Sequence, residues 1–251
     1  MMHDGDPTKF TKVLYGCGYN EISETVLMTP IRAWFDAWKE RWDVKKEFKG
    51  YNQGFRAVVN GVEVSVLDSR VGSPLALDCT YYLRFTSCKN IVFTGLIGAL
   101  QPDIEVGDII VSTGALRGEG ASKYFVDEAY PAVADFSLTR KLADVLDEIY
   151  KGTGITVHYG PIYTTDAFAA ETEEFLKEWG SKGLLGIEME TSAVYTIASL
   201  FGMRATSFHV VSDNPVAKKT FFDALTDTER KRQDESSKLV VEALERLVKE
   251  I

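Results

Sequence analysis

The stretch Gly186-Ile187-Glu188-Met189-Glu190-Thr191 decides the fold, together with the two segments that follow it, 192–201 and 205–213. An apolar run over 183–187 meets two carboxylates one residue apart, and the spacing of apolar residues then changes from strand-like to helix-like. This change predicts a strand that ends at the two carboxylates, a helix over Ser192–Phe201 and a second strand over Ala205–Val211.

Three acidic residues follow these two strands. In an alternating strand end, Glu188 and Glu190 point to the same side, where like charges raise each other's pKa unless a ligand such as a sugar diol shares them. Asp213 follows the second strand, and such strand ends line the ligand crevice of open α/β sheets. The alternative is that the two glutamates favour a helix entry and Asp213 a turn. The three acids together favour a site.

Composition limits the class of protein. With 251 residues and no linker-like segment, the chain is predicted to form a single domain over 1–251 with a substantial core. The net charge of −9 argues against nucleic acid or an anionic membrane as a partner, although local charge can still suit a phosphorylated substrate. No apolar stretch approaches the roughly 20 residues of a membrane span, and the start is polar. We therefore expect a cytoplasmic protein with no membrane partner.

Metal chemistry is not expected. The cysteines are odd in number and neither they nor the histidines have the spacing of metal ligands, so reduced thiols are predicted. The residues are Cys17, Cys79, Cys88, His3, His158 and His209. We expect no metal and no organic cofactor.

Strand-like and helix-like segments alternate along the chain. The N-terminal part predicts a strand at Val13–Tyr15, a glycine turn, a long helix over Ile22–Trp42, a hairpin around Asn60-Gly61, and a helix opening with Ser73 as its N-cap. Further strands are predicted at Ile91–Thr94, Val106–Val111 and Ile155–Tyr163, and helices over Leu138–Tyr150, Thr172–Trp179 and Asp227–Lys249. This order predicts an α/β fold with a central mixed, mostly parallel β-sheet flanked by helices.

Several motifs occur in a fixed order. They are Gly95-x-x-Gly98-Ala99-Leu100-x-Pro102, Val106-Gly107-Asp108-Ile109, Tyr130-Pro131-Ala132-Val133-Ala134-Asp135-Phe136, Glu188-Met189-Glu190 and Ser212-Asp213. Together they resemble the nucleoside phosphorylase and nucleosidase superfamily, which includes uridine phosphorylase, hexameric purine nucleoside phosphorylase, methylthioadenosine/S-adenosylhomocysteine nucleosidase and AMP nucleosidase. The resemblance covers most of the chain from Gly54 to the last helix. It implies a nucleoside phosphorylase-like fold and cleavage of an N-glycosidic bond.

The resemblance also implies roles for individual residues. Glu190 matches the carboxylate that binds the ribose hydroxyls, Met189 the residue that packs on the sugar, and Phe168 the aromatic residue beside the base. Asp213 matches the acid that protonates a purine at N7. Thr94-Gly95 resembles the substrate loop of the nucleosidases. A nucleoside, with a purine-type base favoured, is the substrate that these matches imply.

Other positions depart from the phosphorylases. The positions that carry their phosphate-binding arginines align with Asn20, Gly50 and Phe93, and a neighbouring hydroxyl position is Leu96. None of these side chains is basic, whereas phosphate binding is favoured by the forked donors of arginine. Arg70 supplies one compensating charge, binds a substrate carboxylate or phosphate, or pairs with a surface acid.

Glu21 favours hydrolysis. It lies five residues after Gly16, the spacing at which nucleosidases place the glutamate that activates water. The alternative is a carboxylate that favours a helix N-terminus.

The base is less clearly indicated than the reaction. The positions with which uridine phosphorylase reads uracil align with Thr172 and Glu174, which cannot make the same contacts. Segments 118–122 and 131–136 nevertheless resemble uridine phosphorylase.

Three functions stay open. Hydrolysis of a purine-type nucleoside is favoured, with Glu21 and Asp213 as catalytic residues. Phosphorolysis with inorganic phosphate as co-substrate is the alternative, through a rebuilt site that uses Arg70, Arg117 or an arginine of another subunit. The third is a non-catalytic nucleoside-binding protein. The family resemblance also implies a homo-oligomer, a dimer or a hexamer, in which His3 reaches a neighbour's sugar or lies in a mobile terminus.

Overall fold

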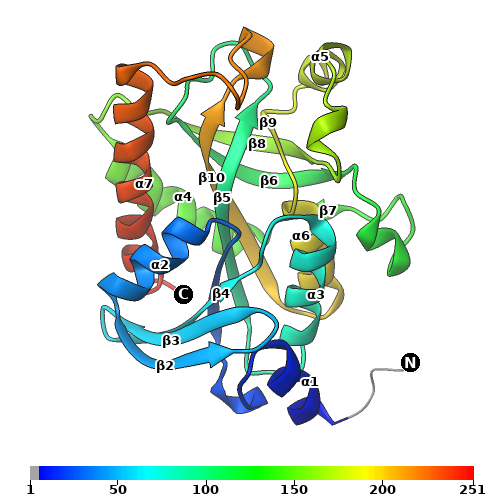
Figure 1. Ribbon diagram of the computed structural model, residues 1–251, viewed down its shortest axis with the longest axis vertical. Coiled ribbons are helices and arrows are strands. Elements are labelled where there is room, and N and C mark those ends of the chain that lie inside the picture. The colour runs from blue at the N-terminus through cyan, green and yellow to red at the C-terminus, as the bar shows by residue number, and fades with distance from the viewer. Residues whose placement is uncertain (1–5) are drawn as a thin grey trace.

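One mixed β-sheet runs through the computed structural model, which describes residues 6–251 (Figure 1). The strand order is β10-β6-β8-β9-β5-β1-β4-β3-β2, with β7 on β6 and a further pairing of β10 with β5. The strands are β1 Thr25–Thr29, β2 Asp43–Lys49, β3 Gln53–Val59, β4 Val62–Asp68, β5 Asn90–Ala99, β6 Ile109–Arg117, β7 Ala132–Val133, β8 Val157–Thr164, β9 Gly186–Glu188 and β10 Arg204–Asp213. His3, for which an active-site contact was considered, lies outside the described residues.

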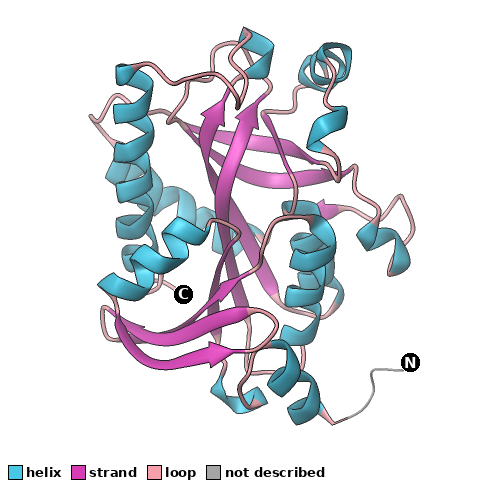
Figure 2. Cartoon of the chain, viewed as in Figure 1, coloured by secondary structure: helices cyan, strands magenta, loops and turns pink. Residues whose placement is uncertain are grey.

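Helices cover both faces of the sheet (Figure 2). They are α1 Pro7–Leu14, α2 Arg32–Arg41, α3 Ser73–Leu83, α4 Phe136–Tyr150, α5 Glu173–Ser181, α6 Thr191–Leu200 and α7 Asp227–Leu247. One large core joins α2, α4 and α7 to the strands, and a second joins α3 and α6 to the opposite face. The predicted α/β class with a mixed sheet is confirmed. Parallel pairings join β5 to both β1 and β10, whereas the hairpin strands and the β10–β6 pair are antiparallel.

The N-terminal elements differ from the prediction. The predicted strand at Val13–Tyr15 is the end of α1, which starts where the Asp6 side chain accepts a hydrogen bond from the Thr8 N–H at 2.9 Å. The predicted helix over Ile22–Trp42 is divided into strand β1 and the shorter helix α2. Pro30 explains the division, because it lacks an N–H and disfavours helical backbone in the residue before it.

The central hairpin and the start of α3 lie where they were predicted. Asn60 and Gly61 have positive φ angles of 49° and 86°, which the turn between β3 and β4 requires. The helix α3 begins at Ser73, but its N-cap is Gly72, so the predicted capping role of Ser73 is wrong. The Ser73 hydroxyl instead donates to the Met189 carbonyl at 2.6 Å, which ties α3 to the segment between β9 and α6.

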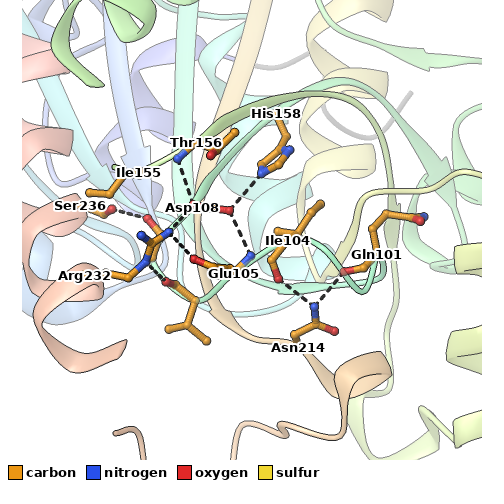
Figure 3. Close-up of polar contacts among 12 residues, drawn as sticks. Gln101, Ile104, Glu105, Asp108, Ile155, Thr156, His158, Asn214, Arg232 and Ser236 are labelled. Atoms are coloured by element: carbon orange, nitrogen blue, oxygen red, sulfur yellow. Dashed lines mark hydrogen bonds and ion pairs between the residues drawn. The ribbon is translucent and has the colours of Figure 1, made fainter. Parts of the chain in front are cut away.

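A buried carboxylate joins the last helix to the start of β6 (Figure 3). Asp108 accepts hydrogen bonds from the Thr156 N–H at 3.0 Å, the Glu105 N–H at 3.0 Å, the Arg232 guanidinium at 2.7 Å and, at 3.1 Å, His158 Nε2. Burial raises the pKa of Asp108, but the hydrogen bonds from His158, Thr156 and Glu105 outweigh it and leave the pKa lowered. The resulting stabilisation is present above the ordinary carboxyl pKa and is lost as the pH falls through the lowered value.

Asn214, the residue after β10, fixes the end of that strand (Figure 3). Its side-chain amide donates to the carbonyls of Gln101 and Ile104, each at 2.8 Å. The backbone that carries Asp213 is therefore held against the loop that follows β5.

We expect Arg232→Ala to lower the free energy of unfolding by about 2–4 kcal/mol, because it leaves Asp108 buried with fewer donors and removes bonds to two backbone carbonyls. Urea denaturation measures the change. Arg230→Ala, an exposed arginine on the same helix, is the matched control and should change the value by less than about 0.5 kcal/mol. Equal losses in the two variants would contradict a specific role of the Asp108 contacts.

Candidate active site

A cavity of about 320 Å³ opens at the carboxyl ends of β5, β9 and β10. Its size lies within the range of small-molecule sites. The wall contains four acids and is otherwise largely apolar: Glu171, Glu188, Glu190, Asp213, Ser212, Pro30, Ile31, Val71, Leu96, Ile97, Gly98, Phe168, Ile187, Met189 and Phe221. No lysine or arginine within residues 6–251 lines it. The cavity is therefore suited to a neutral ligand with polar groups that face carboxyls.

Glu188 borders this cavity but is engaged by its own chain. One carboxylate oxygen accepts from the Thr164 hydroxyl at 2.5 Å. The other accepts from the N–H groups of Glu190 and Thr191, each at 2.8 Å, and from the Thr191 hydroxyl at 2.9 Å. Glu188 thus satisfies orphan donors at the start of α6 and fixes the Glu190 backbone.

Glu188 and Glu190 both line the cavity, but their hydrogen-bond partners differ. The strand β9 ends at Glu188, and the backbone at Glu190 has φ −137° and ψ −38° as it turns into α6. The alternation of a strand stops at this turn, so the two side chains have different surroundings.

Glu190 is almost fully buried, with 5% of its surface exposed. One oxygen accepts from the Gly72 N–H at 2.5 Å. Burial raises the pKa of Glu190, the nearby Glu188 charge raises it further, and the N–H groups of Gly72 and Met189 lower it in part. Gly72 has φ 105°, a conformation that favours glycine, so the N–H that meets Glu190 depends on that residue. Additional hydroxyl donors from a ligand would favour the ionised carboxylate.

Asp213 ends strand β10 and is 6% exposed. The Ser212 hydroxyl donates to one of its oxygens at 2.6 Å, and burial raises its pKa above the ordinary value. Gly98 lies opposite, where a Cβ atom would come within 3.5 Å of that carboxylate. A carboxyl that keeps its proton longer than usual suits proton donation to a leaving group.

Aromatic side chains form the wall beside Asp213. Phe168 and Phe221 both line the cavity, with ring centroids 6.1 Å apart at a nearly perpendicular angle. Phe222 lies 5.7 Å from Phe168 and is mostly exposed. These rings offer a surface on which a flat heterocycle can stack.

Glu171 was not predicted as a site residue, yet it lines the cavity. Burial raises its pKa to about 7, and the nearby Asp213 charge adds to the rise. The two positions that align with the uracil-reading residues of uridine phosphorylase are Thr172, which is the N-cap of α5, and Glu174, which is exposed. Glu171 follows a short 3-10 turn, Phe168–Ala170, so no regular period predicts where its side chain points.

Glu21 lies elsewhere. It precedes the amino end of β1, whereas the cavity lies beyond the carboxyl end of that strand, which is about 16 Å long. Its carboxylate accepts from the Gly18 N–H at 2.7 Å and pairs with Lys46, whose hydrogen bond lowers the pKa of Glu21. The prediction that Glu21 activates water in this cavity is wrong, because the glycine turn before it does not follow a strand.

The other predicted substrate contacts do not line the cavity either. Arg70 stacks its guanidinium 4.6 Å from the centre of the Tyr51 ring and donates to the Tyr51 carbonyl at 2.8 Å. Thr94 is 1% exposed within β5, and a Cβ on Gly95 would lie 3.3 Å from Pro30, so these two residues pack beneath the cavity wall. The Arg117 guanidinium also has partners elsewhere: it donates hydrogen bonds to the Ser122 hydroxyl and to backbone carbonyls of the loop that follows β6.

Two further observations concern metal sites and membrane spans among the described residues. Among residues 6–251, no three His, Cys, Asp or Glu side chains gather in a way that could hold a metal ion. Within the same range, none of the helices is both long and apolar enough to span a lipid bilayer.

Comparisons with known proteins point to one family. The model of a family described as the phosphorylase superfamily matches residues 40–250. A guanosine phosphorylase of Halorubrum lacusprofundi is 33% identical over 172 residues, which cover 68% of each chain. A DeoD-type purine nucleoside phosphorylase of Clostridium novyi is 30% identical over 236 residues, which cover 92% of this chain and 97% of the other. A uridine phosphorylase of Klebsiella aerogenes is 31% identical over 210 residues, which cover 77% and 79%.

The fold is also that of a solved structure. A uridine phosphorylase of Vibrio fischeri ES114 superimposes with a TM-score of 0.77 at 24% identity, over 91% of this chain and 92% of the other. At this identity the likeness concerns the fold.

Proposed function

Since the chain belongs to the phosphorylase superfamily, we propose that it cleaves the N-glycosidic bond of a nucleoside, and that its substrates are purine nucleosides. The observation that carries the proposal is the placement of Glu190 and Asp213 in one cavity with different surroundings. Glu190 contacts the Gly72 N–H at the start of α3, whereas Asp213 lies with Glu171 and the aromatic wall. The first arrangement suits a sugar and the second a base.

Glu190 and Asp213 stabilise the two charges that develop on the sugar and on the base as the glycosidic bond breaks. Positive charge on the sugar is favoured by the Glu190 carboxylate, which also accepts hydrogen bonds from the ribose hydroxyls while Met189 packs on the ring. Negative charge on the departing base is neutralised by a proton from Asp213. Phe168 stacks on the base.

We favour water as the nucleophile. Inorganic phosphate is an anion, and the cavity wall in residues 6–251 has four carboxyls and no cation. The aligned phosphate-binding positions support this choice, because Phe93 is fully buried and Leu96 places an apolar side chain on the wall. Water forms a bond to the anomeric carbon as the bond to the base breaks, the base leaves with the Asp213 proton, and the proton released by the water restores protonated Asp213 through solvent. This reaction has no need of an anion site.

Phosphorolysis is the second candidate, and the names of the three relatives favour it. It requires inorganic phosphate as co-substrate and cations from outside the cavity wall. A second copy of the chain in the predicted homo-oligomer would be their source.

The experiment is an incubation of the protein with guanosine, inosine, adenosine and uridine, each with and without inorganic phosphate. We expect free ribose from purine nucleosides at the same rate in both conditions. If ribose 1-phosphate forms, and only when phosphate is present, the reaction is phosphorolysis and not hydrolysis. Thermal stabilisation by nucleosides without any product would instead indicate a non-catalytic binding protein.

A further inference from the structure

Glu171 has no catalytic part in the proposed reaction, yet it lines the cavity. It lines the same cavity as Asp213, the proton donor, whose charge influences its pKa, and as Phe168 and Phe221, which form the stacking surface. A base held by these groups therefore has its edge within reach of Glu171. This inference rests on the proposed function, because it concerns the base of the same nucleoside.

The carboxyl of Glu171 is uncommitted. Among residues 6–251 it has no hydrogen bond and no ion pair, whereas Glu188 and Glu190 accept from neighbouring N–H groups and Asp213 accepts from the Ser212 hydroxyl. A half-buried carboxyl without partners is costly, and donors supplied by a ligand remove that cost. Both oxygens of Glu171 are therefore available to one ligand.

The neighbouring Asp213 determines which ligand edge fits. We assign the proton of the pair to Asp213, because the leaving base needs it. The protonated Asp213 has no charge, so one cause of the raised pKa of Glu171 is absent and its ionised form is favoured. An ionised carboxylate offers two acceptors side by side and repels lone pairs. It fits an edge on which two N–H donors are adjacent.

Purines differ in this respect. Guanine has the N1–H beside the 2-amino group, so it offers two adjacent donors. Hypoxanthine has the N1–H alone. Adenine has a lone pair at N1 beside its 6-amino group, which places an acceptor against the carboxylate.

We propose that Glu171 is the specificity-determining residue of the base end of this cavity, and that it selects guanine-type bases through paired hydrogen bonds to N1–H and the 2-amino group. The wild-type order of kcat/KM is therefore guanosine, then inosine, then adenosine. Bidentate recognition of this kind discriminates between bases by about 10- to 100-fold.

Glu171→Gln tests the proposal, because an amide replaces one acceptor by a donor and leaves the size of the side chain unchanged. We expect kcat/KM for guanosine to fall about 10- to 100-fold, and the ratio of adenosine to guanosine turnover to rise. Purine riboside, which has neither donor, should change by less than about twofold. The matched control is Glu174→Gln, which changes an exposed glutamate in the first turn of α5 and should leave the rates with guanosine, adenosine and purine riboside unchanged.

Binding of the free bases gives a second readout. Calorimetry with guanine, hypoxanthine and adenine should show that the variant loses affinity for guanine alone. An equal loss for all bases, no loss at all, or a wild-type preference for adenine would overturn the proposal. If the wild-type protein cleaves no nucleoside but Glu171→Gln still loses guanine selectively, the proposed function fails and the inference about Glu171 stands.

Discussion

Replacing Asp213 by asparagine lowers kcat for a purine nucleoside by about 10²- to 10⁴-fold, which is the usual contribution of a positioned general acid. The amide keeps the size of the side chain and its contact with Ser212 but has no proton to give. The departing base must then leave as an anion inside a largely apolar cavity. Steady-state kinetics on guanosine and inosine measure the effect.

The leaving group provides the decisive comparison for this variant. A nitrophenyl riboside releases nitrophenolate, which is stable as an anion and needs no proton from the enzyme. Its cleavage rate should therefore fall less than about tenfold in Asp213→Asn. The control Asp103→Asn changes an exposed aspartate in the loop after β5 and should leave both rates unaltered. Equal losses with the two leaving groups would show that Asp213 acts on the shape of the site instead of on the proton.

Replacing Glu190 by alanine should lower kcat/KM for ribonucleosides by about 100-fold. Two hydroxyl hydrogen bonds to a buried carboxylate are worth about 1.5–3 kcal/mol each. Part of this is offset, because the wild-type protein must keep Glu190 ionised beside the Glu188 charge and the variant does not. The measurement compares each ribonucleoside with its 2′-deoxy analogue. Wild type should prefer the ribonucleoside, and the variant should treat the two alike.

A control separates the loss of the carboxylate from a loss of folding. Glu173→Ala, at an exposed position in α5 whose partner is Lys177, should preserve the preference for the 2′-hydroxyl. If Glu190→Ala keeps that preference while losing activity, the sugar is bound by other groups and the assignment of Glu190 is wrong.

Much of the fold could be predicted from the sequence, because local chemistry agrees with the final structure in many segments. The Asn60-Gly61 turn, the Pro74 at the start of α3 and the change of period after Glu190 are each decided within a few residues. The predicted strand at Val13–Tyr15 failed because Asp6 and Pro7 start a helix upstream, and the long helix failed because Pro30 divides it.

The site was predictable where residues lie at strand ends. Met189, Glu190 and Asp213 were expected at one sheet edge, and the structure places all three around one cavity together with Phe168. Their roles stay predictions. Glu188 also lines the cavity, but its hydrogen bonds to the start of α6 could not be predicted, because they depend on the backbone turn at Glu190.

Longer-range placement was harder to predict. Glu21 was assigned from spacing alone, and spacing does not state at which end of β1 a residue lies. Glu171 lines the cavity but was missed because it follows an irregular turn, where only tertiary packing sets the direction of a side chain.

The place of β10 in the sheet has a consequence for biosynthesis. This strand, near the end of the chain, pairs with β5 over its length and also with β6. On the ribosome, both of those strands keep an open edge until the chain has been made as far as Asp213, and open edges template pairing between chains. Closure between such distant segments is slow, so we expect a fragment that ends before β10 to aggregate more readily than the full chain.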